Sequence, residues 1–173
     1  MNQESIWGDR YRDAGEAYLF GTAPNRFLAQ RAVLLATGQT AVSVGDGEGR
    51  NSVWLAEQGL DVTAVEISAV GIEKARRLAA GRKVDVRFMQ ADMLAPDWPP
   101  LEMHHAFDWV IGIFIQFAGP AERARQFAVL KVLARPGGRI LLHGYTPRQI
   151  EYRTGGPSAR RGSDRLGRLA SGT

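Results

Sequence analysis

Short apolar segments alternate with longer segments of helix-forming character between residues 41 and 143. The apolar segments are rich in Val and Ile, which favour strands, and the longer ones begin or end at Ser, Pro or Gly. The predicted strands are 41–45, 61–66, 83–89, 107–114 and 139–143. The predicted helices between them are 49–58, 68–80 and 120–133. Strands that alternate with helices predict right-handed βαβ units and a parallel sheet.

Residues 1–36 precede the first strand, and the first 24 of them are polar with interspersed aromatic side chains. A short helix is expected over 7–17 and a turn over 18–24, where a glycine and a proline interrupt the chain. Asn25 is positioned to cap a second helix. We therefore predict an N-terminal helical lid segment.

The strand pattern stops after Tyr145, and the remaining residues are dominated by Gly, Ser and Arg. Residues 1–157 are predicted to form one domain, and residues 158–173 a flexible tail. The tail has no β-branched alternation that would form two further strands. We therefore expect strand 139–143 to leave an exposed sheet edge, through which copies of the chain can form a homo-oligomer.

A glycine-rich loop joins the first strand to the helix that follows it, with Gly45, Gly47 and Gly49 at every second position. Glycine allows positive φ and close approach of a ligand, and the helix N-terminus behind the loop favours negative charge. Arg50 stands where a G-x-G-x-x-G dinucleotide fingerprint has its third glycine, and no Gly-Lys-Ser/Thr follows. The pattern indicates a nucleotide-type ligand, with a tight turn alone as the alternative.

Two carboxylates follow the next strands, Glu66 at the end of the second and Asp92 after the third. Glu66 can accept both hydroxyls of a ribose, and Asp92 can accept a hydrogen bond from an adenine amino group. Residues 112–116 close the fourth strand beside the same crevice, because open α/β sheets bind ligands at the carboxyl ends of their strands. A solvated strand end for Glu66 and a turn or cap for Asp92 are the alternatives. The joint spacing of these groups with the glycines favours a ligand site.

Four motifs have counterparts in a known family: 44–51, 63–68, 90–92 and 133–138. They resemble class I S-adenosylmethionine-dependent methyltransferases, and within these the small bacterial tellurite-resistance and thiol methyltransferase-like enzymes. Residues 18–25 resemble the segment of such enzymes that closes over the cofactor. The resemblance covers residues 1–157. It implies an α/β Rossmann-like three-layer sandwich with a parallel sheet of order 3-2-1-4-5, lacking the antiparallel strand pair that usually ends it.

The resemblance implies S-adenosyl-L-methionine as the cofactor. It implies that the binding residues are Gly45, Asp46, Gly47, Arg50, Asn51, Glu66, Ile67, Asp92, Met93, Ile113 and Phe114. The two glycines would lie against the methionine part, and Glu66 would hold the ribose hydroxyls. Ile67 would pack on adenine, while Asp92 and Met93 would bind its edge.

The other implied residues have less definite roles. Ile113 and Phe114 would line the opposite side of the site. Arg50 and Asn51 open the helix, where they would help to hold the cofactor carboxylate. Asp46 replaces the commoner small residue. A second acid near the methionine amino group is one interpretation of it, and its role stays unassigned.

Methyl transfer is an in-line displacement for which the protein supplies position and desolvation. A soft nucleophile such as a thiolate needs little base catalysis, whereas a hydroxyl or amine acceptor needs a proton acceptor. The candidate catalytic residues are Tyr11, Tyr18, His143 and Tyr145, with packing as the alternative, most of all for His143. His104 and His105 are expected in a solvated loop, because two adjacent histidines alone do not predict a metal site.

Composition restricts the partners and the compartment. The net charge is +4 and the pI about 9.8, with arginines concentrated near the C-terminus. Because no aromatic residues interleave with these arginines, we interpret them as a solvated tail and not as a nucleic-acid site. The chain has no cysteine, its N-terminus lacks a signal-peptide pattern, and its longest apolar run, 109–115, is too short for a bilayer. We therefore expect a cytoplasmic protein without a membrane or nucleic-acid partner.

The sequence thus predicts a methyltransferase that acts on a small molecule, such as a thiol or a chalcogen oxyanion. A cofactor-binding protein with impaired catalysis, acting through association, is the alternative. A nicotinamide-dependent oxidoreductase is disfavoured by Arg50 and by the placement of Asp92. A nucleic-acid methyltransferase is disfavoured by residues 115–118, Ile-Gln-Phe-Ala, where such enzymes carry an Asn/Asp-Pro-Pro-Tyr/Phe motif.

Overall fold

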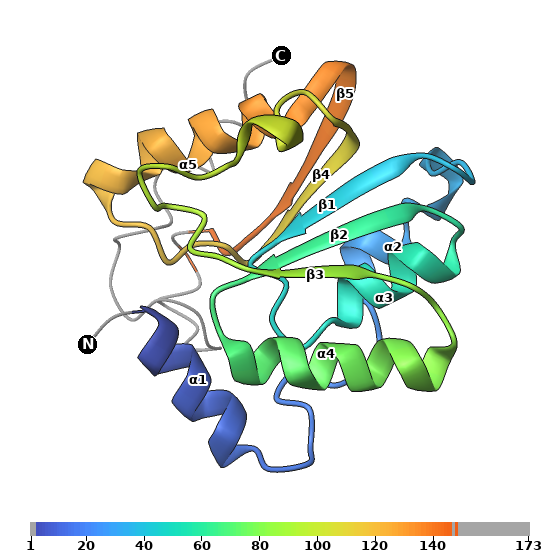
Figure 1. Cartoon of the computed structure of the whole chain (residues 1–173), viewed down its shortest axis with the longest axis vertical. Coiled ribbons are helices and arrows are strands. Elements are labelled where there is room, and N and C mark those ends of the chain that lie inside the picture. The colour runs from blue at the N-terminus through green and yellow to red at the C-terminus, as the bar shows by residue number, and fades with distance from the viewer. Residues whose placement is uncertain (1–2, 147, 149–173) are drawn as a thin grey trace.

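The computed structural model describes residues 3–146 and residue 148. Its centre is a parallel sheet of five strands in the order β3-β2-β1-β4-β5 (Figure 1). The strands are β1 Thr40–Val44, β2 Asp61–Glu66, β3 Arg87–Gln90, β4 Phe107–Ile113 and β5 Ala134–His143. The predicted Rossmann-like α/β fold and its strand order are confirmed.

Helices cover both faces of the sheet. The helices of the described residues are α1 Gln3–Asp13, α2 Arg26–Ala29, α3 Arg50–Glu57, α4 Ala69–Arg82 and α5 Pro120–Leu133, with short 3-10 turns at Ala32–Leu34 and Leu101–Met103. Figure 1 shows α5 on one face of the sheet and α3 and α4 on the other. Helix α1 lies outside these layers, in contact with α4.

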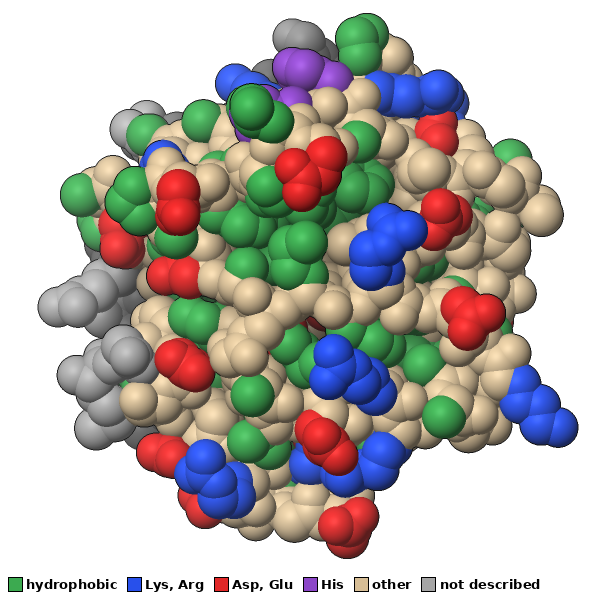
Figure 2. Space-filling view, in the orientation of Figure 1, with side chains coloured by type: hydrophobic (Ala, Val, Ile, Leu, Met, Phe, Trp, Pro, Cys, Tyr) green, Lys and Arg blue, Asp and Glu red, His purple; other side chains and the backbone are tan. Residues whose placement is uncertain are grey.

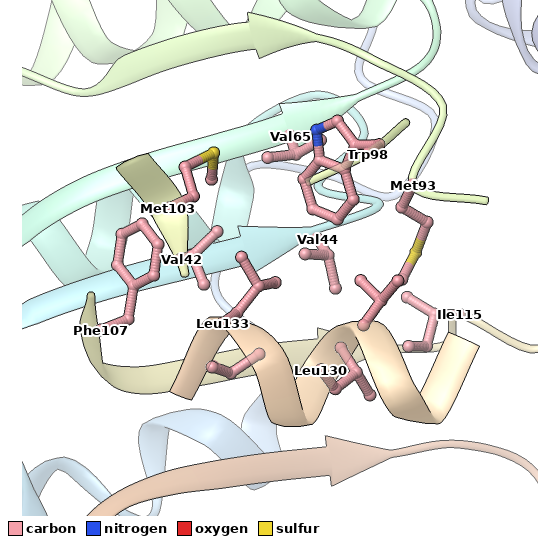
Figure 3. Close-up of a cluster of buried hydrophobic side chains, with 12 residues drawn as sticks. Val42, Val44, Val65, Met93, Trp98, Met103, Phe107, Ile115, Leu130 and Leu133 are labelled. Atoms are coloured by element: carbon pink, nitrogen blue, oxygen red, sulfur yellow. The ribbon is translucent and has the colours of Figure 1, made fainter. Parts of the chain in front are cut away.

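The larger hydrophobic cluster fills the space between the sheet and α5 (Figure 3). Val42 and Val44 of β1 point toward Leu130 and Leu133 of α5, and all four side chains are buried. These valines are two residues apart, so they share one face of the strand. Ala41, the neighbour of Val42 in β1, points to the opposite face of the sheet and packs with the cluster on the α3 side.

Several element ends differ from the prediction. Helix α4 continues through Gly81 to Arg82, and Lys83 closes it with a left-handed φ of 58°. Since this cap redirects the chain, residues 84–86 approach the sheet as a loop, and β3 begins only at Arg87. The local sequence permitted a strand there, but pairing with β2 starts at Arg87.

The start of β5 also differs. Ala134 pairs with Phe107 and Arg139 with Trp109, so residues 135–138 form a bulge inside β5 where a separate turn was predicted. Gly137 has a φ of 77°, which explains a glycine in the bulge. Asn25 caps the second N-terminal helix, as expected. This helix, α2, is short and ends at Ala29.

Part of the C-terminal prediction cannot be compared with the structure. The boundary at residue 157 and the tail 158–173 lie outside the described residues. Within the described part of the chain, β5 is an edge of the sheet, and homo-oligomerisation through it stays a prediction. No described helix combines the length and the hydropathy that crossing a membrane requires.

Leu133→Ala is expected to destabilise the protein by about 2–5 kcal/mol, because it opens a cavity between α5 and β1. Leu101→Ala is the matched control, since Leu101 is 82% exposed. Urea denaturation followed by circular dichroism measures both free energies of unfolding. Equal losses for the two variants would contradict the packing described for α5.

Candidate functional site

A cavity of about 1200 Å³ opens at the carboxyl ends of β1, β2 and β4. Its lining comes from the sheet, the glycine-rich loop, α1 and the loop after β4. The described residues that line it are Gln3, Trp7, Arg10, Tyr11, Phe20, Gly21, Gly45, Asp46, Gly47, Glu48, Arg50, Asn51, Val65, Glu66, Ile67, Ala91, Asp92, Met93, Ile113, Phe114, Gln116, Phe117, Ala118, Gly119, Glu122 and Tyr145. The cavity therefore contains all eleven predicted cofactor residues.

The glycine-rich loop requires glycine for two reasons. Gly45, Gly47 and Gly49 all have positive φ, between 60° and 89°, which L side chains rarely adopt. A Cβ atom on Gly47 would lie 2.8 Å from the hydroxyl oxygen of Tyr11, and one on Gly49 would lie 2.7 Å from Cβ of Ala75. At Gly47 and Gly49 the protein itself therefore leaves no space for a side chain, while the predicted contact of Gly45 and Gly47 with the cofactor stays a prediction.

Asp46 has a structural role that the sequence left unassigned. Its Oδ1 accepts a hydrogen bond from Ser43 Oγ at 2.7 Å, and its Oδ2 accepts one from Ser52 Oγ at 2.5 Å. Burial raises the pKa of Asp46, and the two serine hydrogen bonds oppose that rise. The carboxylate therefore joins β1 to α3 directly behind the glycine-rich loop.

Glu66 is held at the end of β2 by backbone N–H groups on both sides. Its Oε2 accepts from Gly47 N at 2.9 Å, and its Oε1 accepts from Ser68 N at 3.0 Å. Burial raises the pKa of Glu66 to about 7, although these backbone hydrogen bonds act in the opposite direction. The carboxylate faces the cavity in a fixed orientation.

The predicted adenine contacts lie together on the β2–β3 side of the cavity. Asp92 is exposed, and its Oδ1 accepts from Leu94 N at 2.8 Å, so the turn alternative is also satisfied. Ile67 is half-buried, and Met93 is buried in the α5-side core. The three side chains form one wall of the cavity with an acceptor at its rim.

The opposite wall is built from the ends of β4 and β5. Phe114 has a left-handed φ of 58°, and its N–H donates to His143 O at 2.7 Å. The Phe114 ring stacks on Tyr145 with centroids 4.6 Å apart. Gln116 fixes Tyr145 by donating to its carbonyl at 2.7 Å and accepting from its N–H at 2.5 Å. Tyr145 is thereby positioned at the cavity, and its catalytic role stays a prediction.

His143 lies between two aromatic rings and has a polar partner. Its Nδ1 is 3.0 Å from Asn25 Oδ1, an oxygen that also accepts from two backbone N–H groups. Because that oxygen is an acceptor, we assign the proton to Nδ1. The ring packs against Phe27 and Phe114, and burial lowers its pKa. His143 does not line the cavity, which favours the packing alternative.

Residues 3–21 form an N-terminal cover on the cavity. A buried ammonium group anchors it: Lys74 Nζ of α4 donates to Tyr11 O at 2.8 Å, to Ala17 O at 2.8 Å and to Glu48 Oε1 at 2.9 Å. Glu48 Oε2 in turn accepts from Leu19 N at 2.7 Å. Lys74 and Glu48 are only 3% and 4% exposed. The cover is therefore tied to the glycine-rich loop and to α4 by one ion pair.

Two tyrosines predicted as catalytic candidates occupy different places in the cover. Tyr11 is buried and lines the cavity, with its hydroxyl against Gly47. Burial and then the charge of Glu66 raise the pKa of Tyr11. Tyr18 is absent from the described lining; it donates to Lys74 O at 3.0 Å and packs on the Val53 cluster. The structure thus favours a packing role for Tyr18.

Arg50 and Asn51 connect the start of α3 to the N-terminal segment. Arg50 donates to Phe20 O at 3.0 Å, and Asn51 Oδ1 accepts from Asn25 N at 2.9 Å. Both residues also line the cavity. Their contacts with the chain and their predicted position at the cofactor carboxylate are compatible.

The paired histidines make separate contacts away from the cavity. The ring nitrogen of His104 is 3.0 Å from Pro99 O, and that of His105 is 3.1 Å from Ala134 O. No group of three His, Cys, Asp or Glu side chains with metal-binding geometry occurs in residues 3–146 and 148.

Sequence reasoning missed Lys74, Glu48, Gln116 and the cover residues Trp7 and Arg10. One signal was available for Lys74, because it lies beside the apolar positions of α4 that face the core. Nothing in the local sequence indicates that Gln116 binds the backbone of Tyr145.

Lys74→Met is expected to destabilise the protein by about 3–5 kcal/mol, because it leaves Glu48 buried without its partner. The double variant Lys74→Met, Glu48→Gln should recover part of that loss. Arg82→Met is the matched control, since Arg82 pairs with Glu57 between α3 and α4 on the surface. Urea denaturation measures stability, and limited proteolysis reports on residues 3–21. A loss no larger than that of the control would refute the anchoring role.

Glu66 predicts a pH dependence of stability. Its pKa is about 7 in the folded protein against a reference of 4.5, so the folded state binds this proton more readily than the unfolded state. The free energy of unfolding should therefore fall by at most about 3 kcal/mol as pH rises between these values. Glu66→Gln removes the titration. Urea denaturation of both proteins at about pH 5 and about pH 8 tests this. If their free energies of unfolding differed by the same amount at both pH values, the prediction would be contradicted.

Comparison with known proteins identifies the fold family. Residues 41–138, more than half of the chain, match the family model of the methyltransferase domain. The ribosomal RNA small subunit methyltransferase C of Chromohalobacter salexigens is 29% identical over 114 residues, which cover 61% of this chain and 31% of that protein. The chain thus spans about a third of the length of this curated relative.

Solved structures show the same architecture. A structure from work on the conversion of a disulfide bond into a thioacetal group during echinomycin biosynthesis has a TM-score of 0.73 at 22% identity, covering 88% of this chain and 63% of that one. DhpI in complex with S-adenosylmethionine has a TM-score of 0.61 at 23% identity, covering 88% and 70%. The chain belongs to the methyltransferase domain family, whose cofactor is S-adenosylmethionine.

Proposed function

We propose that this protein transfers a methyl group from S-adenosylmethionine to a small, soft nucleophile, a thiol or a chalcogen oxyanion. The family and its cofactor support the transfer. The choice of acceptor is supported by the chemistry of the cavity lining.

The lining fits the cofactor in three parts. Gly45 exposes backbone at the turn, the fixed carboxylate of Glu66 can accept from ribose hydroxyls, and Asp92 keeps an exposed acceptor near Ile67. When bound, S-adenosylmethionine supplies an electrophilic methyl group on a sulfonium. The protein's own contribution is to orient the two reactants and to exclude water between them.

The observation that carries the proposal is that no His or Lys side chain is free to act as a base among the described residues of the lining. The described residues of the lining include neither His nor Lys. Each of its five carboxylates, Asp46, Glu48, Glu66, Asp92 and Glu122, accepts a hydrogen bond within the chain, and we assign the remaining acceptor capacity of Glu66 and Asp92 to the cofactor. The raised pKa of Tyr11 keeps its phenol neutral, so it can donate a hydrogen bond but is a poor base. A hydroxyl or amine acceptor would need a base, and the carboxylates of this lining are engaged by the chain or assigned to the cofactor.

A thiolate needs no proton acceptor at the moment of transfer. Its lone pair forms the new sulfur–carbon bond while the bond from carbon to the sulfonium breaks, and that electron pair stays on the departing sulfur. The cavity of about 1200 Å³ also exceeds the 300–1,000 Å³ or so of a site for one drug-sized ligand, which leaves room for a small acceptor beside the cofactor.

Ribosomal RNA is the second candidate acceptor, because the curated relative is a ribosomal RNA methyltransferase. Two observations weigh against it. The segment after β4 reads Ile-Gln-Phe-Ala over 115–118, and Gln116 there is engaged with the backbone of Tyr145. Figure 2 shows acidic and basic side chains interspersed on the viewed face, without the continuous basic patch that RNA binding favours.

Calorimetry with S-adenosylmethionine and with NAD tests the cofactor, and transfer of a labelled methyl group to thiols, selenite and an rRNA fragment tests the acceptor. We expect binding of S-adenosylmethionine only and methylation of a thiol or of selenite. Glu66→Ala should weaken cofactor binding by about tenfold or more through loss of charge-assisted hydrogen bonds. Glu57→Ala, on the surface of α3, should leave it unchanged.

Three outcomes would overturn parts of this proposal. Binding of NAD alone would remove the methyltransferase function. Methylation of RNA but of no small acceptor would establish the second candidate. Cofactor binding without transfer to any acceptor would favour a protein that acts through association.

A further inference from the structure

Arg10 of the N-terminal cover has a position that cofactor binding does not explain. It lines the cavity from α1, and its guanidinium carbon lies 4.5 Å from the ring centroid of Trp7 and 5.9 Å from that of Phe20. The two rings are 6.3 Å apart. Contacts of this kind orient a guanidinium and leave its N–H edges open to a further partner.

The charge of Arg10 is not compensated by a neighbouring carboxylate. Among the described residues, Arg10 takes part in no ion pair, whereas Arg12 of the same helix pairs with Asp9 at 2.6 Å. In the glycine-rich loop, Glu48 is already paired with Lys74. Arg50 adds a second positive charge, with its guanidinium 5.6 Å from the same Phe20 ring. Two guanidinium groups therefore lie near the Phe20 ring in this part of the cavity.

Arg10 and Arg50 belong to different elements, α1 and α3. Arg50 begins α3 directly after the glycine-rich loop, where the cofactor carboxylate is predicted. Arg10 lies on the cover, beside Phe20, which is 47% exposed and so marks the solvent side of the cavity.

We propose that Arg10 binds an anionic group on the methyl acceptor, so that the preferred acceptor is a small thiol that also carries a carboxylate. This inference rests on the proposed function. A guanidinium presents a planar fork of donors that matches a carboxylate, and Trp7 and Phe20 hold that fork in place before the acceptor arrives. The methylated atom and the recognised anion are then separate groups of one molecule.

The test compares mercaptoacetate, which carries a carboxylate, with 2-mercaptoethanol, which is similar in size and neutral. The two thiols differ in their own acidity, so the informative quantity is the change in the ratio of their kcat/KM values on substitution. Arg10→Met should raise KM for mercaptoacetate by about tenfold, the effect of one lost charge-assisted hydrogen bond. KM for 2-mercaptoethanol and the Kd for S-adenosylmethionine should stay unchanged.

Two further variants control for unrelated effects. Arg12→Met removes the same charge from the same helix outside the cavity and should change none of these quantities. Arg10→Lys keeps the charge without the fork and should recover part of the lost preference. Equal effects of Arg10→Met on both thiols, or a weaker Kd for S-adenosylmethionine, would overturn the assignment.

A binding measurement separates this inference from the proposed function. Mercaptoacetate is titrated by calorimetry into the protein saturated with S-adenosylhomocysteine. Binding that Arg10→Met weakens supports the anion site, even if neither thiol is methylated and the proposed acceptor chemistry fails. No binding, or binding that Arg10→Met leaves unchanged, overturns the anion site, whatever the activity shows.

Discussion

The buried ion pair between Lys74 and Glu48 is the interaction on which the site depends. Glu48 belongs to the glycine-rich loop, Lys74 to α4, and the ammonium group also binds two carbonyls of the N-terminal cover. Removing two charges from water is costly, and here every oxygen of the carboxylate and every proton of the ammonium has a partner. The loop, the helix and the cover therefore form one unit.

This unit explains why the loop is rich in glycine. Tyr11 of the cover occupies the space over Gly47, and Ala75 of α4 occupies the space beside Gly49. A side chain at either position would displace the cover or the helix as well as strain the backbone. The same glycines that favour a cofactor thus also bring the walls of its cavity together.

The cavity combines strong positioning with little acid–base chemistry. Its buried carboxylates serve as structural acceptors, the stacked rings of Phe114 and Tyr145 are held by Gln116, and Arg10 and Arg50 line it with guanidinium groups. Such a lining suits a reaction in which the bound molecules carry the reactive groups and the protein fixes their geometry. The same lining gives an anionic acceptor a place to bind without supplying a base.

The sequence by itself determined the alternation of strands and helices, the glycine-rich loop and the positions of Glu66 and Asp92, because these are local signals. The strand order was implied by the resemblance to methyltransferases. Only the tertiary structure decided that Tyr11 faces the cavity while Tyr18 and His143 face packing partners. It also decided that Lys74 reaches a carboxylate 26 residues away in the chain. These outcomes depend on how residues 3–29 pack on α4 and on the end of β5, and contacts between separate elements leave no periodic trace in the sequence.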